Sequence, residues 1–119
     1  MIGMDTRGKM IASSEAARLA AKGATVVSGY FDPLLASHAR RLADLKNGAK
    51  LIVVIEDPPR PILPARARAE LVASLRAVDY VVSEHHGIRV DVRLEDEDGK
   101  RFEELLTHVH TRQRGASQR

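Results

Sequence analysis

Hydrophobic residues along this chain form short continuous runs that alternate with segments of helical periodicity. The runs at residues 24–28, 50–55 and 80–82 are too continuously apolar for a strand with one wet face, so they predict buried parallel strands. Between the runs, residues 36–46 and 65–77 carry apolar side chains three and four positions apart, which is typical of amphipathic helices. The first strand, helix and second strand predict a right-handed βαβ unit.

The segments on either side of this unit have other patterns. Ser13 is expected to cap a first helix that Gly23 terminates. Residues 88–94 alternate between apolar and polar, which predicts a strand at a sheet edge or a subunit contact. Residues 96–99, three acids followed by a glycine, predict a turn. Four apolar residues at helical spacing predict a last amphipathic helix: Phe102, Leu105, Leu106 and Val109.

These elements predict an α/β fold, a three-layer sandwich around a small parallel, Rossmann-like sheet. Residues 1–119 are expected to form a single domain, with residues 1–8 and 114–119 flexible. A sheet of about three strands covers its faces poorly, so we expect a homodimer through the C-terminal part.

Composition excludes several classes of function. The 19 basic residues are nearly balanced by 16 acidic ones, and aromatic residues make up only 3%, so neither a nucleic-acid tail nor a base-stacking platform is expected. The absence of cysteine excludes a disulfide, a thiolate metal site and a cysteine nucleophile, and it suits a reducing cytoplasm. No run approaches the ~18 apolar residues of a membrane span, so a soluble cytoplasmic domain with no membrane partner is expected.

Residues 26–42 contain the strongest candidate for a binding site. A β-branched run reaches Gly29, a turn follows with Asp32 and Pro33, and a helix begins, with Asp32 and Ser37 both able to cap it. Such a strand–turn–helix directs backbone N–H groups and the positive end of a helix at one spot, where a phosphate can bind. The same arrangement also occurs in α/β proteins that bind nothing there.

Part of this segment resembles a known family pattern. Five residues match the pattern G-x-F-D-x-x-H-x-G-H and the leucine that often follows it: Gly29, Phe31, Asp32, His38 and Leu42. The pattern belongs to the nucleotidyltransferase family that includes glycerol-3-phosphate cytidylyltransferases and ADP-heptose synthases. Residues 60–64 (Arg-Pro-Ile-Leu-Pro) and 68–70 (Arg-Ala-Glu) also resemble segments of the heptose-synthase branch, and the likeness covers about residues 9–83.

The resemblance implies that an oxygen of a phosphorylated sugar or polyol attacks the α-phosphorus of CTP or ATP and releases pyrophosphate, usually with Mg²⁺. It implies a catalytic role for His38. The nucleotide and its phosphates would be bound by Gly29, Tyr30, Phe31, Asp32, Ser37, His38, Arg60 and Arg68. From the residues alone, His38 can equally be a packing or capping residue, and the two arginines can equally be solvated. Asp32 suits a turn and cap residue better than a catalytic base.

Four departures from the family pattern favour a different role. Leu35 replaces the first histidine and Ser37 the glycine, residues 56–59 contain no lysine, and the family's late serine/threonine motif has no counterpart. Losing one charge-stabilising donor costs on the order of a hundred- to a thousandfold in rate. The alternative is therefore a non-catalytic derivative that serves as a nucleotide sensor or a protein-interaction subunit. The remaining histidines are expected at the surface: His85, His86, His108 and His110.

Overall fold

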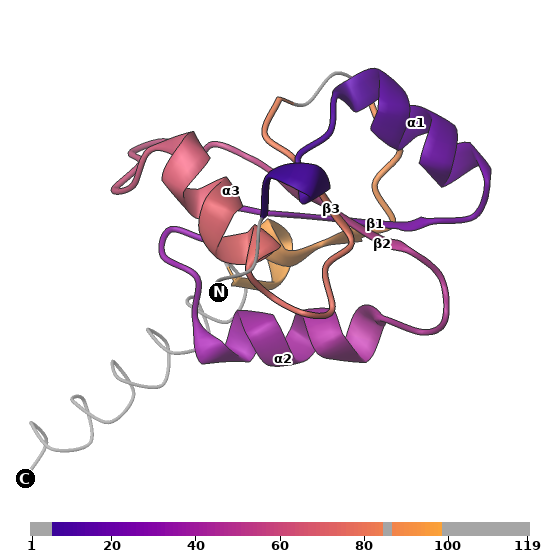
Figure 1. The fold of residues 1–119 in the computed structure, drawn as a ribbon. Helices are drawn as coiled ribbons and strands as arrows, with labels where there is room; N and C mark the ends of the chain where they lie inside the picture. Colours follow the sequence, from indigo (N-terminus) through magenta and orange to yellow (C-terminus); the bar gives the residue numbers. More distant parts are fainter. Residues whose placement is uncertain (1–5, 85–86, 99–119) are drawn as a thin grey trace, which may run out of the picture.

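A four-stranded parallel sheet forms the centre of the molecule in the computed structural model, which describes residues 6–84 and 87–98 (Figure 1). The strands lie in the order β3-β2-β1-β4. Their bounds are β1 Thr25–Gly29, β2 Leu51–Ile55, β3 Tyr80–Val82 and β4 Val92–Arg93. This arrangement confirms the predicted parallel α/β fold, and the three apolar runs supply its three longer strands.

The register of β1 and β2 is continuous, with Thr25 opposite Leu51 and Gly29 opposite Ile55. Both strands are therefore flush at their carboxyl ends, where open α/β sheets bind ligands. All five residues of β2 are buried, as expected of an inner strand covered on both faces.

Helices cover both faces of the sheet. The helical elements are the short η1 Thr6–Lys9 and the helices α1 Ser13–Ala21, α2 Ala36–Leu45 and α3 Ala65–Ala73. Alternate strand residues face two separate cores: Val27 and Val53 pack with α2 and α3, whereas Val26 and Ile52 pack with α1. Figure 1 shows α1 and α2 on opposite sides of the sheet, which is the predicted three-layer arrangement.

Two predicted details of the helices are wrong. Ser13 does not cap α1, because the N-cap is Ala12 and the Ser13 hydroxyl instead donates to the carbonyl of Glu84. The apolar spacing within residues 65–77 predicts Leu71 on the inner face of this helix, but Leu71 is 43% exposed. The reason is that α3 packs on the sheet through its small residues Ala69 and Ala73 and through Val72.

The C-terminal part differs most from the sequence-based prediction. The expected edge strand is present but short, since only Val92 and Arg93 pair with β1, in parallel. Residues 94–98 are helical, so the predicted turn at 96–99 is wrong for its described residues; Leu94 is buried at the start of this segment. The amphipathic helix predicted around Phe102 lies outside the described residues, and the homodimer stays a prediction.

No helix in the described part of the chain combines the length and apolar character needed to cross a membrane.

Candidate functional site

A cavity of about 1140 Å³ lies at the carboxyl ends of β1 and β2. The loop after β1, the first turn of α2, the loop between β2 and α3, and the helical segment 94–98 all contribute to its wall. The lining residues are Tyr30, Phe31, Asp32, Pro33, Leu35, Ser37, His38, Pro58, Arg60, Ile62 and Asp98. Six of the eight residues predicted from the sequence are therefore gathered around one cavity.

His38 occupies the third position of α2 and is only 7% exposed. Its Nδ1 accepts the backbone N–H of Leu35 at 3.0 Å, so the ring hydrogen resides on Nε2. That Nε2 lies 2.7 Å from Oδ2 of Asp98. The imidazole also packs edge-to-face with the ring of Phe31, with ring centroids 5.4 Å apart and planes at 79°. Three contacts thus fix the ring in one orientation at the cavity wall.

The start of α2 is capped differently from the prediction. Its N-cap is Leu35, and neither Asp32 nor Ser37 caps the helix. His38 satisfies one backbone donor at the start of the helix, because its side chain accepts the N–H of Leu35. The other N–H groups of the first turn have no acceptor within the helix, and this turn forms part of the cavity wall. The positive end of α2 is therefore available to an anion in the cavity.

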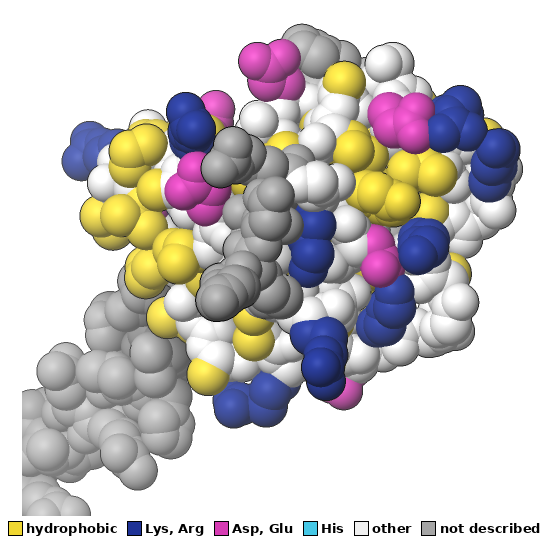
Figure 2. Space-filling view, viewed as in Figure 1, with side chains coloured by type: hydrophobic (Ala, Val, Ile, Leu, Met, Phe, Trp, Pro, Cys, Tyr) yellow, Lys and Arg dark blue, Asp and Glu magenta, His cyan; other side chains and the backbone are white. Residues whose placement is uncertain are grey.

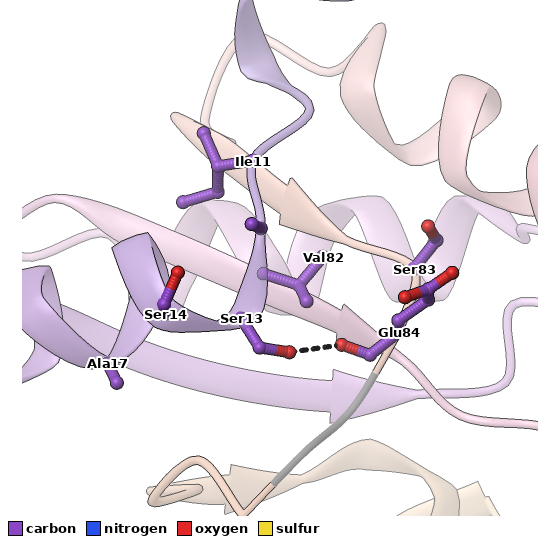
Figure 3. A pocket seen from close by; sticks show the side chains of 8 residues that line it. Ile11, Ser13, Ser14, Ala17, Val82, Ser83 and Glu84 are labelled. Carbon is purple, nitrogen blue, oxygen red and sulfur yellow. Dashed lines mark hydrogen bonds between the residues drawn. The ribbon is translucent and has the colours of Figure 1, made fainter.

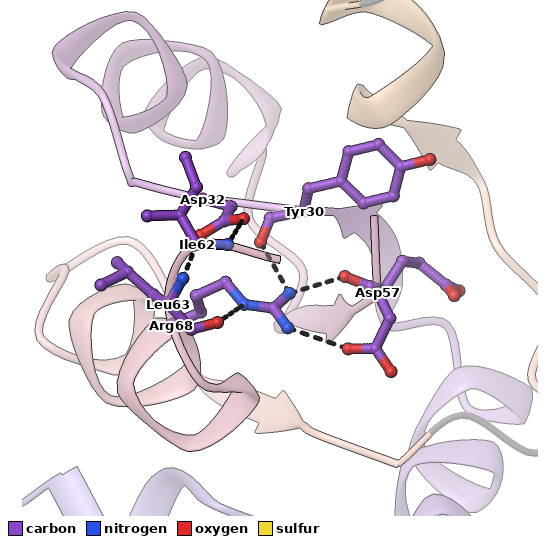
Figure 4. Close-up of polar contacts among 7 residues, drawn as sticks. Tyr30, Asp32, Asp57, Ile62, Leu63 and Arg68 are labelled. Carbon is purple, nitrogen blue, oxygen red and sulfur yellow. Dashed lines mark hydrogen bonds and ion pairs between the residues drawn. The ribbon is translucent and has the colours of Figure 1, made fainter. Parts of the chain in front are cut away.

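Asp32 connects the two loops of the site instead of capping α2 (Figure 4). Its carboxylate accepts the backbone N–H groups of Ile62 and Leu63, both at 2.7 Å. The hydrogen bond from Ile62 is the main reason that the pKa of Asp32 lies below its ordinary value; Leu63 and the charge of Arg68 act in the same direction, against partial desolvation. Asp32 therefore holds residues 62–63 against the cavity as an anion.

Arg68 ties the same loops together through a second set of hydrogen bonds (Figure 4). Its side chain is 1% exposed, so the alternative of a solvated arginine is wrong. The guanidinium donates to the carbonyls of Leu63, Tyr30 and Glu56 at 3.0, 3.1 and 2.8 Å, and to Oδ1 of Asp57 at 2.8 Å. A direct contact between Arg68 and a phosphate stays a prediction; the observed contacts make it a clamp between the loops after β1 and β2.

Gly29 leaves room for the aromatic ring that forms the floor of the cavity. A Cβ at this position would lie 2.6 Å from two ring carbons of Phe31. Phe31 is buried and adopts a positive φ of 50°, which turns its side chain back over the end of β1. Gly29 is therefore required by packing against Phe31, and it does not itself line the cavity.

The rim of the cavity is more apolar than the sequence analysis predicted. Leu35 and Ile62 have side chains 52% and 77% exposed. In Figure 2, hydrophobic side chains gather over the loop that precedes α3 and toward the start of α2. Among the described lining residues, Arg60 supplies the positive charge, and Asp32 and Asp98 are acidic.

Asp98 was missed from the sequence. It belongs to the acidic run 96–98, which was interpreted as a turn, and its contact with His38 joins positions 60 residues apart. No local pattern signals such a pairing. The contributions of Pro58 and Ile62 follow from the loop held by Asp32, which is also a long-range contact.

A second cavity, of about 580 Å³, lies where α1 begins beside the carboxyl end of β3 (Figure 3). Its lining includes Ser13, Ser14, Ser83 and Glu84. The Ser13 hydroxyl donates to the Glu84 carbonyl at 2.5 Å, which joins the two sides of the opening. The described lining holds an acidic side chain and no basic one.

Among residues 6–84 and 87–98, no three His, Asp or Glu side chains gather into a group that could hold a metal ion.

No known family model matches this chain. A search of characterised proteins finds similarity to the bifunctional protein HldE of Aeromonas hydrophila, 33% identical over 90 residues, covering 67% of this chain. The chain spans only 19% of the length of that relative. The similarity supports, loosely, the resemblance of this chain to the nucleotidyltransferase family, without naming a nucleotide or an acceptor.

Proposed function

We propose that this chain is a nucleotidyltransferase-like domain that binds CTP or ATP in the cavity at the carboxyl ends of β1 and β2. The observation that carries the proposal is the convergence of three groups suited to phosphate on one cavity. These are the Nε2 side of His38, the first turn of α2 and the guanidinium of Arg60.

The apolar rim suits the remainder of a nucleotide. Leu35, Pro58 and Ile62 offer a surface on which a base or ribose can lose water, while the phosphates lie against α2. Mg²⁺ would arrive with the nucleotide, held mainly by its phosphates, and neutralise part of their charge.

Transfer of the nucleotidyl group is the reaction that this site would support. An oxygen of a phosphorylated sugar or polyol would form a bond to the α-phosphorus as the bond to pyrophosphate breaks. His38 and the N–H groups of α2 would stabilise the charge on the phosphate oxygens. Leu35 can contribute no such donor from its place on the wall, so we expect transfer to be slow.

A second candidate is a non-catalytic nucleotide sensor or protein-interaction subunit. This candidate is favoured by Leu35, an exposed apolar side chain at the position where the nucleotidyltransferase pattern has its first histidine. Binding would survive this replacement better than rate acceleration, because a ground-state site tolerates the loss of one donor more easily than a transition state does.

Calorimetric titration with CTP and ATP, each with and without Mg²⁺, tests the proposal. We expect saturable binding of at least one nucleotide, weakened by about tenfold or more in His38→Ala, which removes one charge-assisted donor. Ser14→Ala, a small change at the mouth of the other cavity, is the matched control and should bind as wild type does. No binding of either nucleotide to the wild type would contradict the proposal.

Pyrophosphate release separates the two candidates once binding is established. Release that depends on an added sugar phosphate or polyol phosphate supports transfer. Binding without release under the same conditions supports the sensor.

A further inference from the structure

The ring nitrogen of His38 that faces the cavity is already hydrogen-bonded to a carboxylate. Oδ2 of Asp98 lies 2.7 Å from Nε2, and both side chains line the cavity. Because Nδ1 accepts the backbone N–H of Leu35, Nε2 is the one ring atom that can donate to a ligand. The Asp98 carboxylate therefore occupies the position that an anionic oxygen of a ligand would take.

The fold places Asp98 there through two further contacts of the segment 94–98. Glu97 makes a double hydrogen bond with Arg41 of α2, both at 3.1 Å. Glu95 accepts the hydroxyl of Ser28, a buried residue of β1, at 2.5 and 2.9 Å. Neighbouring residues on the same segment are thus anchored to β1 and α2, which holds Asp98 opposite His38.

His38 does not need Asp98 to keep its orientation. The bond from Leu35, the edge contact with Phe31 and a side chain only 8% exposed already fix the ring. The side chain of Asp98, in contrast, is 34% exposed, so its carboxylate can turn toward solvent while the imidazole stays in place. Of the two partners, Asp98 is the one that a ligand can displace.

We propose that Asp98 is a specificity-determining residue of this site, acting as an internal competitor for the anion-binding nitrogen of His38. The proposal rests on the proposed function of the cavity as a phosphate site. A ligand has to exchange the Asp98 carboxylate for its own oxygen, so the site favours a polyphosphate that also engages α2 and Arg60. A small anion that reaches only His38 is excluded by the like charge.

Substitution of Asp98 distinguishes this role from that of a residue that orients His38. Asp98→Asn keeps the shape of the side chain and removes its charge. Asp98→Ala removes the contact altogether. If Asp98 competes with the ligand, both changes tighten binding; if it orients His38, both weaken binding.

The experiment is calorimetric titration of wild type, Asp98→Asn, Asp98→Ala and Asp96→Asn with CTP, ATP and inorganic pyrophosphate, with Mg²⁺ present. Asp96 is exposed on the same segment, so Asp96→Asn makes the same change in net charge at a neighbouring position. We expect both Asp98 variants to bind about tenfold more tightly than wild type, with the largest gain for pyrophosphate, and Asp96→Asn to change affinity less than about twofold.

The outcomes separate failure of this inference from failure of the proposed function. Binding by wild type that is unchanged or weaker in both Asp98 variants overturns the role of Asp98 and leaves the nucleotide site intact. An equal gain in Asp96→Asn also overturns it, because general charge would then explain the effect. Binding that appears only in the Asp98 variants supports the role of Asp98 and contradicts nucleotide binding by the wild-type chain. No binding by any of the four proteins overturns the proposed function and this role together.

Discussion

The helices α1 and α2 each begin beside the carboxyl end of a parallel strand, but of the two only α2 begins at a cavity with groups suited to an anion. Both α1 and α2 lack a side-chain cap, with Ala12 and Leu35 at their N-caps, and both border a cavity. At α1 the cavity is lined by serines and Glu84. At α2 it is lined by His38 of the helix itself and by Arg60, which lies on a loop held by long-range hydrogen bonds.

The start of a helix becomes a candidate anion site because of the side chains and loops around it. The helix dipole is of similar size at both places. What differs is a donor held in one orientation, a cation at the mouth, and Asp32 and Arg68 joining the loops after β1 and β2. The described lining of the α1 cavity holds the acidic Glu84 and no cation, whereas Arg60 accompanies the acidic residues in the lining at α2.

Removing Arg68, the clamp between the loops after β1 and β2, should give the largest loss of stability. Arg68→Ala leaves the carbonyls of Tyr30, Glu56 and Leu63 without their guanidinium donor in a buried position, so we expect the free energy of unfolding to fall by about 2–4 kcal/mol. Urea denaturation measures this change. Arg66→Ala is the matched control: that side chain is 90% exposed and pairs only with Glu70 in the described part of the chain, so its loss should cost less than about 0.5 kcal/mol. An equal loss of unfolding free energy in both variants would contradict the role of Arg68 as a clamp.

Restoring a donor at the start of α2 should sharpen the difference between the two helix ends. Leu35→His places an imidazole where a 52% exposed leucine lines the cavity, so it fits without repacking a core. We expect the rate of nucleotide-dependent pyrophosphate release to rise by about a hundredfold, as one charge-stabilising donor contributes about that much. Leu35→Phe adds a ring without a donor and should not accelerate release. An unchanged rate in Leu35→His would mean that this position does not face the reacting phosphate.

Filling the space above Gly29 should disturb the floor of the cavity. The added methyl group of Gly29→Ala would meet the ring of Phe31 at 2.6 Å, and a side chain this buried has little room to move. We expect a loss of about 1–3 kcal/mol in the free energy of unfolding. Gly8→Ala adds the same group where nothing lies within 4 Å and should be close to neutral. A neutral Gly29→Ala would show that Phe31 is free to shift.

The smallest of these effects should come from acid, which protonates Asp32 and weakens its hydrogen bonds to the loop at residues 62–63. Because its pKa is lowered in the folded protein, Asp32 stabilises the fold fully above the ordinary aspartate value, and this contribution is lost as pH falls below about 4. The difference in unfolding free energy between wild type and Asp32→Asn should therefore be constant above pH 5 and shrink at lower pH. Asp79 also has a lowered pKa: burial raises it, but the hydrogen bonds from Lys46 and Leu51 lower it by more. Because Asp79 is present in both proteins, its titration cancels from the difference between them. A difference independent of pH would contradict the assigned role of Asp32.

The sequence predicted the strands well because their signal is local. Continuous apolar runs such as residues 51–55 have to be buried on both faces, and a parallel sheet between helices provides that. The gathering of Tyr30, Phe31 and His38 at the end of β1 followed from the same strand–turn–helix pattern.

The predictions that failed depend on contacts between distant positions. Asp32 was expected to cap the adjacent helix, yet its acceptor oxygens are used by Ile62 and Leu63, about thirty positions away. The alternative of a solvated Arg68 failed in the same way, because its burial depends on three loop carbonyls that no periodicity reveals.

Amide chemical-shift changes on adding CTP or ATP with Mg²⁺ test the central claim most directly, because both helix ends are observed in one experiment. We predict shifts concentrated at residues 30–38 and around Arg60, with residues 13–17 and 83–84 unchanged. Shifts confined to the α1 end, or none at either end with both nucleotides, would contradict the claim that α2 begins in a nucleotide site.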